Sequence, residues 1–163
     1  MRWGVSERKR MKKSVDRSDY LLVVEDNPLL RLLLAESLTI ADYKVVETGS
    51  ADEALKLLSR GKKFALVITD IEMPGSMDGL ALANVIHERW PEIALIVTSG
   101  RVQPAAGELP IGAKFVKKPS VPHAFIQVVQ SLLIEEKATT SAHETSIKWY
   151  PDGVIEGLRQ PAP

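Results

Sequence analysis

The stretch FALVITDIEMPGSMDGL, Phe64–Leu80, decides the fold. It opens with an apolar, β-branched run that stops at one aspartate, Asp70, and it turns at Met-Pro-Gly before a helical pattern begins. Runs this continuously apolar are typical of strands that are covered on both faces, as in a parallel sheet. A carboxylate at the end of such a strand either caps the next element or takes part in chemistry. The polar residues at the ends of the other predicted strands distinguish these two roles.

The rest of the chain repeats strand, turn and helix with short connections, which predicts parallel strands joined by crossover helices. Pro28 suits a first helical turn. Ser50 with Glu53 predicts a capping box, and Asp78 predicts another helix cap. The predicted strands are Tyr20–Asp26, Tyr43–Gly49, Phe64–Thr69, Ile93–Ser99 and Ala113–Lys118. The predicted helices are Leu29–Ile40, one that starts after Ser50, Gly79–Trp90 and Val121–Glu136.

This order predicts an α/β, flavodoxin-like (βα)5 fold. It is a three-layer sandwich in which helices cover both faces of a five-stranded parallel sheet of order 2-1-3-4-5. Ligands of such sheets bind at the carboxyl ends of the strands, near the switch point between strands one and three. The polar residues at these ends are Glu25, Asp26, Asp70, Thr98, Ser99 and Lys118.

Composition limits the remaining possibilities. A chain of 163 residues with 45% hydrophobic content predicts one buried core with tails. No apolar run is long enough to cross a bilayer and the N-terminus is charged, so we expect a cytoplasmic protein with no membrane insertion. The absence of cysteine excludes disulfides, thiolate metal sites and a cysteine nucleophile.

The two ends differ from the middle of the chain. Residues 1–19 carry seven Lys or Arg against three acids, and we expect a disordered basic arm, with contact to nucleic acid or an anionic membrane as the alternative. Residues 137–163 show no sustained period of 2 or 3.6, which predicts a flexible tail. The folded domain is therefore expected at 20–136.

The polar set resembles the receiver domain of bacterial two-component response regulators, over about residues 20–136. Each motif is common by itself, but all of them occur in order and in register with the five strands. The resemblance is carried by Glu25-Asp26, by Asp70 within DIEMPGSMDG, by Thr98, and by GAKFVKKP, which contains Phe115 and places Lys118 before Pro119.

The resemblance implies a stand-alone, chemotaxis-regulator-like receiver. It implies that Asp70 is the phosphoacceptor, that Lys118 contacts the phosphoryl group, and that the hydroxyl of Thr98, or of Ser99 in its place, senses it. Phe115 is then the switch aromatic. The implied cofactor is Mg2+, and the implied ligands are Glu25, Asp26, Asp70 and the backbone carbonyl of Glu72. The residue types are suited to these roles, since a carboxylate can form an acyl phosphate and Mg2+ prefers oxygen ligands.

The implied function is a phosphorylation-dependent switch, not an enzyme beyond its own phosphorylation and dephosphorylation. A histidine kinase or a histidine phosphotransfer protein would supply the phosphoryl group. The face around Phe115 is expected to form a homodimer or partner contact, and no direct DNA binding is expected. One alternative is a Mg2+-dependent phosphohydrolase with an aspartyl phosphate. Such enzymes carry a second aspartate two residues after the first one, and two residues after Asp26 this chain has Pro28. The other is a pseudo-receiver that is not phosphorylated.

Two departures from the family pattern stand out. The turn MPGSMDG is one residue longer than the commonest spacing, which puts the geometry of that loop in doubt. The segment Arg101–Ala113 contains Pro104, Gly107 and Pro110 where the family has its fourth helix. A proline inside a helix costs about 3 kcal/mol, so we expect this helix to be short or irregular and the output surface to be remodelled.

Overall fold

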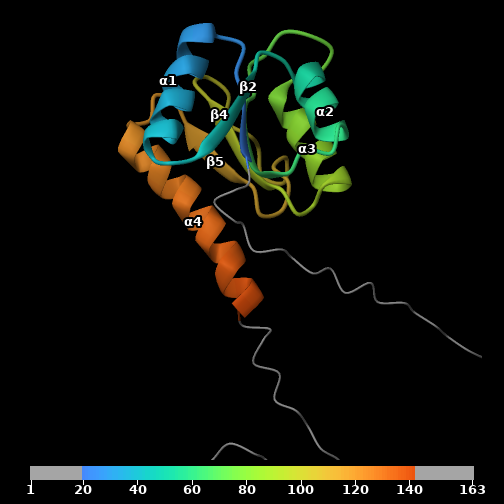
Figure 1. The fold of residues 1–163 in the computed structure, drawn as a ribbon. Coiled ribbons are helices and arrows are strands. Elements are labelled where there is room, and N and C mark those ends of the chain that lie inside the picture. The colour runs from blue at the N-terminus through green and yellow to red at the C-terminus, as the bar shows by residue number, and fades with distance from the viewer. Residues whose placement is uncertain (1–19, 142–163) are drawn as a thin grey trace, which may run out of the picture.

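The computed structural model describes residues 20–141, so the predicted basic arm and residues 142–163 of the predicted tail lie outside the described residues. Five parallel strands form one sheet of order β2-β1-β3-β4-β5, which confirms the predicted flavodoxin-like topology (Figure 1). The strands are β1 (Tyr20–Val24), β2 (Lys44–Thr48), β3 (Phe64–Asp70), β4 (Ala94–Ser99) and β5 (Lys114–Lys117). The helices are α1 (Pro28–Ile40), α2 (Ala51–Ser59), α3 (Gly79–Arg89) and α4 (Pro122–Ser141).

Helices cover both faces of the sheet, with α1 and α4 on one side and α2 and α3 on the other (Figure 1). Side chains alternate between these faces along each strand. In β1, Leu22 and Val24 pack with the α2 and α3 residues, whereas Leu21 and Val23 pack with those of α1 and α4. All seven residues of β3 are buried, as expected for the central strand.

Side-chain caps start three of the helices, and those of α2 and α3 are the predicted ones. Asn27 caps α1, Ser50 caps α2, and Asp78 caps α3 by accepting a hydrogen bond from the Ala81 N–H at 2.8 Å. The capping box at α2 differs in detail from the predicted one. The Glu53 carboxylate accepts hydrogen bonds from the Thr48 hydroxyl at 2.6 Å and from the Gly49 N–H at 3.4 Å. These bonds join the end of β2 to the start of α2.

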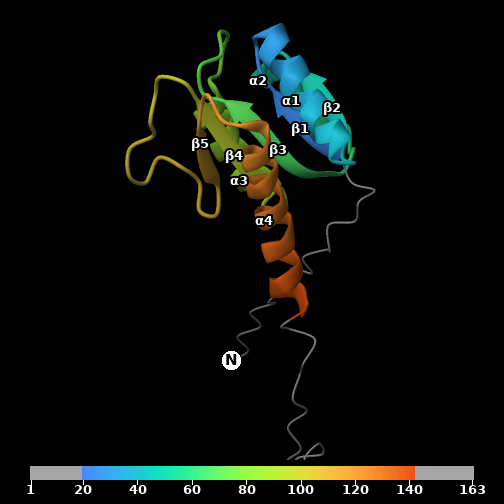
Figure 2. The ribbon, with the colours of Figure 1, turned by 90° about the vertical axis from the view of Figure 1, so that its left-hand side faces the viewer.

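The connection from β4 to β5 contains no helix, where the sequence predicts a helix that is short or irregular (Figure 2, yellow loop). Gly107 adopts a φ of 87°, which a helix cannot include. The loop is held by packing of Leu109 against the core and by a 3.4 Å hydrogen bond from the Asn84 side chain to the Glu108 carbonyl. Between β4 and β5 the structure therefore has a loop where the resemblance implied a helix.

The last helix continues past the predicted end at Glu136 and is described as far as Ser141. The prediction ended where the apolar periodicity ends, but a helix forms its hydrogen bonds internally and needs no apolar side at its terminus. Within residues 20–141, none of the helices combines the length and the apolar character that crossing a membrane requires.

Candidate functional site

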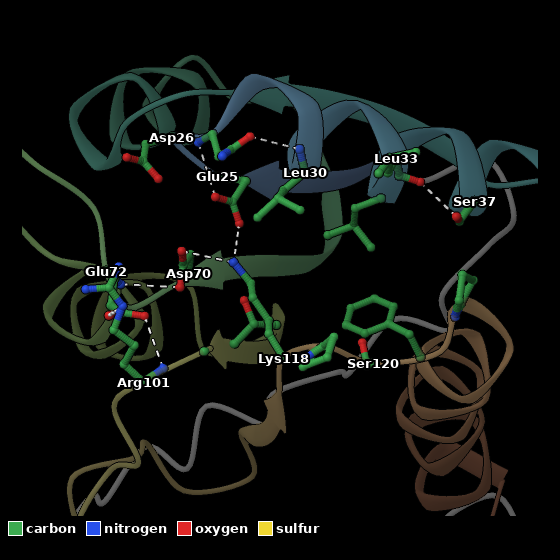
Figure 3. Close-up of a pocket in the computed structure, with 17 residues that line it drawn as sticks. Glu25, Asp26, Leu30, Leu33, Ser37, Asp70, Glu72, Arg101, Lys118 and Ser120 are labelled. Atoms are coloured by element: carbon green, nitrogen blue, oxygen red, sulfur yellow. Dashed lines mark hydrogen bonds and ion pairs between the residues drawn. The ribbon is translucent and has the colours of Figure 1, made fainter.

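The carboxyl ends of β1, β3, β4 and β5 meet at one edge of the sheet, and polar side chains gather there (Figure 3). They come from the ends of four strands or from the loops that follow them, because parallel strands place their carboxyl ends on the same side. Those that line the pocket at this edge include Glu25, Asp26, Asp70, Glu72, Thr98, Arg101 and Lys118.

Asp70 is the last residue of β3 and is buried. Its Oδ2 atom lies 3.0 Å from the Lys118 Nζ atom, and its Oδ1 atom accepts a hydrogen bond from the Glu72 N–H at 3.3 Å. In the β3–β4 pairing, Asp70 stands opposite Thr98. The carboxylate is thus held between a cation and a backbone donor, and it faces the pocket.

Glu25 and Lys118 form a tightly coupled pair, with Nζ 2.5 Å from Oε2. Burial raises the pKa of Glu25 above its ordinary value, although the hydrogen bond and the charge of Lys118 act in the opposite direction. Burial alone would lower the pKa of Lys118, but hydrogen bonds and charges from Glu25 and Asp70 outweigh it, so that pKa is raised. Lys118 therefore remains a cation between two carboxylates at neutral pH.

Asp26 completes a group of three acids. Glu25, Asp26 and Asp70 each offer a carboxylate oxygen, and these atoms lie within 4.8 Å of one another. Asp26 is exposed while the other two are buried, so the group opens to solvent on one side. Hard oxygen donors with room for water suit Mg2+, which usually keeps several waters and takes one or two carboxylates from the protein. The donor set therefore fits this ion.

The predicted switch residues lie at different distances from the acids. The Thr98 hydroxyl is buried and donates to the Thr69 carbonyl at 3.4 Å, next to Asp70. The Ser99 hydroxyl donates to the Glu72 carboxylate at 3.2 Å. Phe115 is partly buried against the core that faces α2 and α3 and does not line the pocket. The structure thus brings the polar residues together and leaves Phe115 outside the pocket.

Sequence reasoning missed the side chain of Glu72, which was expected to contribute only its backbone carbonyl. Its Oε2 atom also accepts from the Arg101 N–H at 3.3 Å, and its Oε1 atom lies 3.6 Å from the Arg101 Nε atom. This carboxylate therefore connects the loop after β3 to the loop after β4. No local pattern signals the contact, because its partners lie nearly 30 residues apart.

Sequence reasoning also missed the contacts that Arg31 and Gly79 make with the backbone of the site. Arg31 appeared in the sequence only as a polar break in a leucine-rich helix, but its Nη1 atom donates to the Glu25 carbonyl at 2.6 Å. A Cβ atom on Gly79 would lie 1.8 Å from the Asp70 carbonyl oxygen, so the start of α3 lies directly against the end of β3. The pair Asp78-Gly79 was a visible signal for the second contact, but only as a helix start.

The pocket extends beyond the acids between α1 and α4 and has a volume of about 800 Å³. Apolar side chains form this extension, with Leu30, Leu33 and Leu34 from α1 and Phe125 from α4 (Figure 3). Leu30 and Leu33 are exposed. The polar site is therefore continuous with an apolar groove.

Residues 21–130 match the family described as the response regulator receiver domain. The chain belongs to this family. Apart from Tyr20, the match covers all five strands, and it covers most of the helical residues, so the receiver fold and the resemblance seen in the sequence agree.

Two curated relatives illustrate the family. The response regulator protein FleR of Pseudomonas aeruginosa is 35% identical over 112 residues, which are 67% of this chain and 23% of that protein. The sensor kinase CckA of Brucella abortus is 33% identical over 114 residues, which are 68% of this chain and 12% of that protein. This chain thus spans less than a quarter of the length of either relative.

Two solved structures are similar over most of their own length. A response regulator receiver protein from Sinorhizobium medicae superposes with a TM-score of 0.67 at 26% identity, covering 72% of this chain and 96% of that one. The receiver domain of NtrX from Brucella abortus superposes with a TM-score of 0.63 at 31% identity, covering 69% of this chain and 97% of that one.

Proposed function

We propose that the chain is a phosphorylation-dependent signalling switch that accepts a phosphoryl group on Asp70 in the presence of Mg2+. The observation that carries this proposal is the position of the Asp70 carboxylate, 3.0 Å from Lys118 Nζ and grouped with the carboxylates of Glu25 and Asp26. One nucleophile, one fixed cation and a set of metal ligands are the parts that phosphoryl transfer requires.

The proposed reaction is a displacement at phosphorus. An Asp70 carboxylate oxygen forms a bond to the phosphorus atom while the bond to the leaving group breaks, which is a P–N bond when the donor is a phosphohistidine. The released imidazole retains the electron pair of that bond. Water later attacks the acyl phosphate, restores the carboxylate and releases inorganic phosphate.

The protein contributes position and charge. Lys118 already donates to Asp70 and carries a raised pKa, so its ammonium is available for an oxygen of the incoming phosphoryl group. Glu25, Asp26, Asp70 and the backbone carbonyl of Glu72 would hold Mg2+. When bound, this ion neutralises negative charge on the transferred phosphoryl group.

Thr98 is the proposed sensor of the phosphoryl group. It lies opposite Asp70 in the sheet and makes a 3.4 Å hydrogen bond to a backbone carbonyl, which is near the limit for such a bond. A hydroxyl held this weakly can turn toward a phosphoryl oxygen. Phe115 would then fill the space that Thr98 leaves, and Ser99 is less suited because it already bonds Glu72.

We propose a histidine kinase or a histidine phosphotransfer protein as the phosphoryl donor. The groove between α1 and α4 supports this proposal, because it leads directly to Asp70 and exposes Leu30 and Leu33. A helix with an apolar side that carries the phosphohistidine could cover these leucines and deliver the phosphoryl group in one pose.

Labelling with acetyl phosphate tests the proposal without a kinase. We expect one phosphoryl group per chain in the presence of Mg2+ and none with EDTA. Borohydride reduction converts an aspartyl phosphate to homoserine, so mass spectrometry should locate homoserine at position 70. Asp70→Asn should abolish the label, whereas Asp42→Asn, at an exposed aspartate after α1, should be labelled like the wild type.

The alternatives give different results in the same experiment. A label that persists in Asp70→Asn would contradict the assignment of the acceptor. A wild-type chain that binds Mg2+ but takes no label from acetyl phosphate or from a kinase is a pseudo-receiver. Rapid release of phosphate over many turnovers, with little label at any time, would favour a phosphohydrolase.

A further inference from the structure

Arg31 lies next to the acidic site but outside the pocket. Its Nη1 atom donates to the Glu25 carbonyl at 2.6 Å and lies 3.5 Å from the Asp26 carbonyl. Its Nε atom is 3.9 Å from the Glu47 carboxylate on β2. The side chain is 24% exposed. One guanidinium therefore contacts the chain at the end of β1 and the neighbouring strand.

The surroundings leave room for this side chain. A Cβ atom on Gly49 would lie 3.3 Å from Nη1, so a larger residue there would press on the guanidinium. The Arg31 N–H donates to the Asn27 carbonyl at 2.9 Å, which places Arg31 one turn into α1. Hydrogen bonds from a charged donor are about twice as strong as those between neutral groups. Arg31 thus restrains mainly the peptide that joins the two acidic residues, through the Glu25 carbonyl, because its 3.5 Å contact with the Asp26 carbonyl is at the limit of a hydrogen bond.

The two acids depend on this restraint to different degrees. The Glu25 carboxylate accepts hydrogen bonds from Lys118 and from the Asn27 N–H at 3.2 Å, so its position has other supports. Among residues 20–141, no hydrogen bond or ion pair reaches the Asp26 carboxylate. Its direction therefore follows from the backbone that carries it.

We propose that Arg31 is a positioning residue for the metal site, which holds the backbone of Glu25 and Asp26 so that the Asp26 carboxylate points toward Asp70. This inference rests on the proposed function, because it takes the three acids as Mg2+ ligands. The competing explanation is structural: Arg31 joins β1 to β2 and stabilises the fold without affecting the ligands.

Three variants separate these explanations. Arg31→Met keeps much of the length and apolar stem but removes every donor. Arg31→Lys keeps the charge but loses the planar guanidinium, which faces the carbonyls with Nη1 and Glu47 with Nε. Glu47→Gln is the matched control, because it removes the ion pair with Arg31 and leaves the bonds to the carbonyls. Circular dichroism should verify that each variant is folded at the assay temperature.

The main measurement is Mg2+ affinity by titration calorimetry, with no phosphoryl donor present. Loss of a residue that orients metal ligands typically lowers metal affinity about 10-fold or more, and we expect this for Arg31→Met. Arg31→Lys should recover part of the affinity, and Glu47→Gln should stay within about twofold of the wild type. With Mn2+ as the probe, water proton relaxation should change in Arg31→Met, because a displaced carboxylate is replaced by water.

Labelling by acetyl phosphate provides a second readout. If Arg31 acts through the ligands, saturating Mg2+ should restore most of the labelling rate in Arg31→Met, because Asp70 and Lys118 are unchanged. Mg2+ affinity within twofold of the wild type in Arg31→Met, together with a lower melting temperature in EDTA, would overturn the proposal. If Arg31→Met does not fold, Arg31→Lys decides by the same comparison.

The outcome can be separated from that of the proposed function. A wild-type chain that is never labelled, but whose Mg2+ affinity depends on Arg31, would contradict the phosphoryl switch and support the positioning role. A labelled wild type whose Mg2+ affinity is independent of Arg31 would support the phosphoryl switch and contradict the positioning role. A wild type that binds no Mg2+ contradicts both.

Discussion

Gly79 shows how closely one residue determines the site. The backbone of Asp70 occupies the space where a Cβ atom of residue 79 would lie, at 1.8 Å from the carbonyl oxygen. The Gly79 N–H also donates to the Ile71 carbonyl at 3.2 Å. The start of α3 is therefore packed directly against the backbone that carries the proposed phosphoacceptor. The longer turn before it does not disturb this contact.

We expect Gly79→Ala to lower the free energy of unfolding by about 1–3 kcal/mol, the usual range for overpacking, because the backbone must move apart. Urea unfolding without metal measures this. Gly100→Ala is the control, since its Cβ would have its nearest neighbours at 3.9 and 4.0 Å, and it should change stability by less than about 0.5 kcal/mol. Equal stability of Gly79→Ala and the wild type would show that the helix start can shift freely.

Glu25 gives the site a pH dependence. Burial raises the pKa of its carboxyl in the folded state above the unfolded value near 4.5. The folded state then binds more protons than the unfolded state between these two pKa values, so this group's contribution to stability falls as pH rises through the raised pKa. Mg2+ would offset this loss by binding the ionised form.

Comparison of the wild type with Glu25→Gln tests whether the contribution of Glu25 to stability falls or rises with pH. In EDTA, the unfolding free energy of the wild type minus that of Glu25→Gln should decrease as pH rises from about 4.5 toward neutrality. Urea unfolding at several pH values measures this difference. Glu92→Gln, at an exposed glutamate, serves as the control for charge removal. A difference that increases with pH would mean that the pairing with Lys118 outweighs burial.

At the scale of one element, α1 has an unusual surface. It contains Leu29, Leu30, Leu32 and Leu33 in its first two turns, and all four are exposed. Leu30 and Leu33 line the pocket next to the acids, whereas Leu32 does not. A helix that packed only on the sheet would need a narrower apolar stripe. The additional leucines indicate a second contact surface, on the side that leads to Asp70.

We expect Leu33→Gln to slow phosphotransfer from a histidine kinase that phosphorylates the wild type, by about fivefold or more if the leucine is buried at the interface centre. Labelling by acetyl phosphate should not change, because the small donor does not need the groove. Leu32→Gln is a matched control, as Leu32 is 47% exposed and Leu33 is 51% exposed. Equal slowing by both variants, or an equal loss with acetyl phosphate, would exclude docking in this groove.

At the scale of the whole molecule, the connection from β4 to β5 is the longest stretch within residues 20–141 that contains neither helix nor strand. The Arg101 and Val102 N–H groups donate to the side chains of Glu72 and Ser99. Within the loop, the Glu108 N–H donates to the Ala105 carbonyl. Segments held in this way can open without disturbing the sheet. Because Glu72 also donates its N–H to Asp70, a change at the acceptor can reach this loop directly.

Hydrogen exchange should detect this coupling. We expect the amides of residues 101–111 to exchange quickly in the unmodified chain and to become protected when beryllofluoride mimics the phosphoryl group. Thr98→Ala should remove this change, because the proposed sensor is lost. The control is β1, whose exchange should be the same in both states. Equal exchange of residues 101–111 with and without beryllofluoride would mean that the signal leaves by another surface.

The sequence by itself determined the order of the elements and the edge at which the polar residues meet. Apolar runs and turn residues predict five parallel strands, and the carboxyl ends of parallel strands must lie on one side. The positions of Glu25, Asp70 and Lys118 follow from this rule, although Glu25 and Lys118 are 93 residues apart. Prolines and glycines likewise predict that the helix between β4 and β5 is interrupted, since their backbone preferences act locally.

Only the tertiary structure decided which neighbours support the site. The contact of Arg31 with the Glu25 carbonyl, the double role of Glu72 and the close approach at Gly79 depend on ångström-scale distances between elements. Periodicity reports which side of an element is buried, but it contains no information about the partner that a polar side chain reaches across an edge. Arg31 looks like a solvated helix residue until β2 and the loop after β1 are placed beside it.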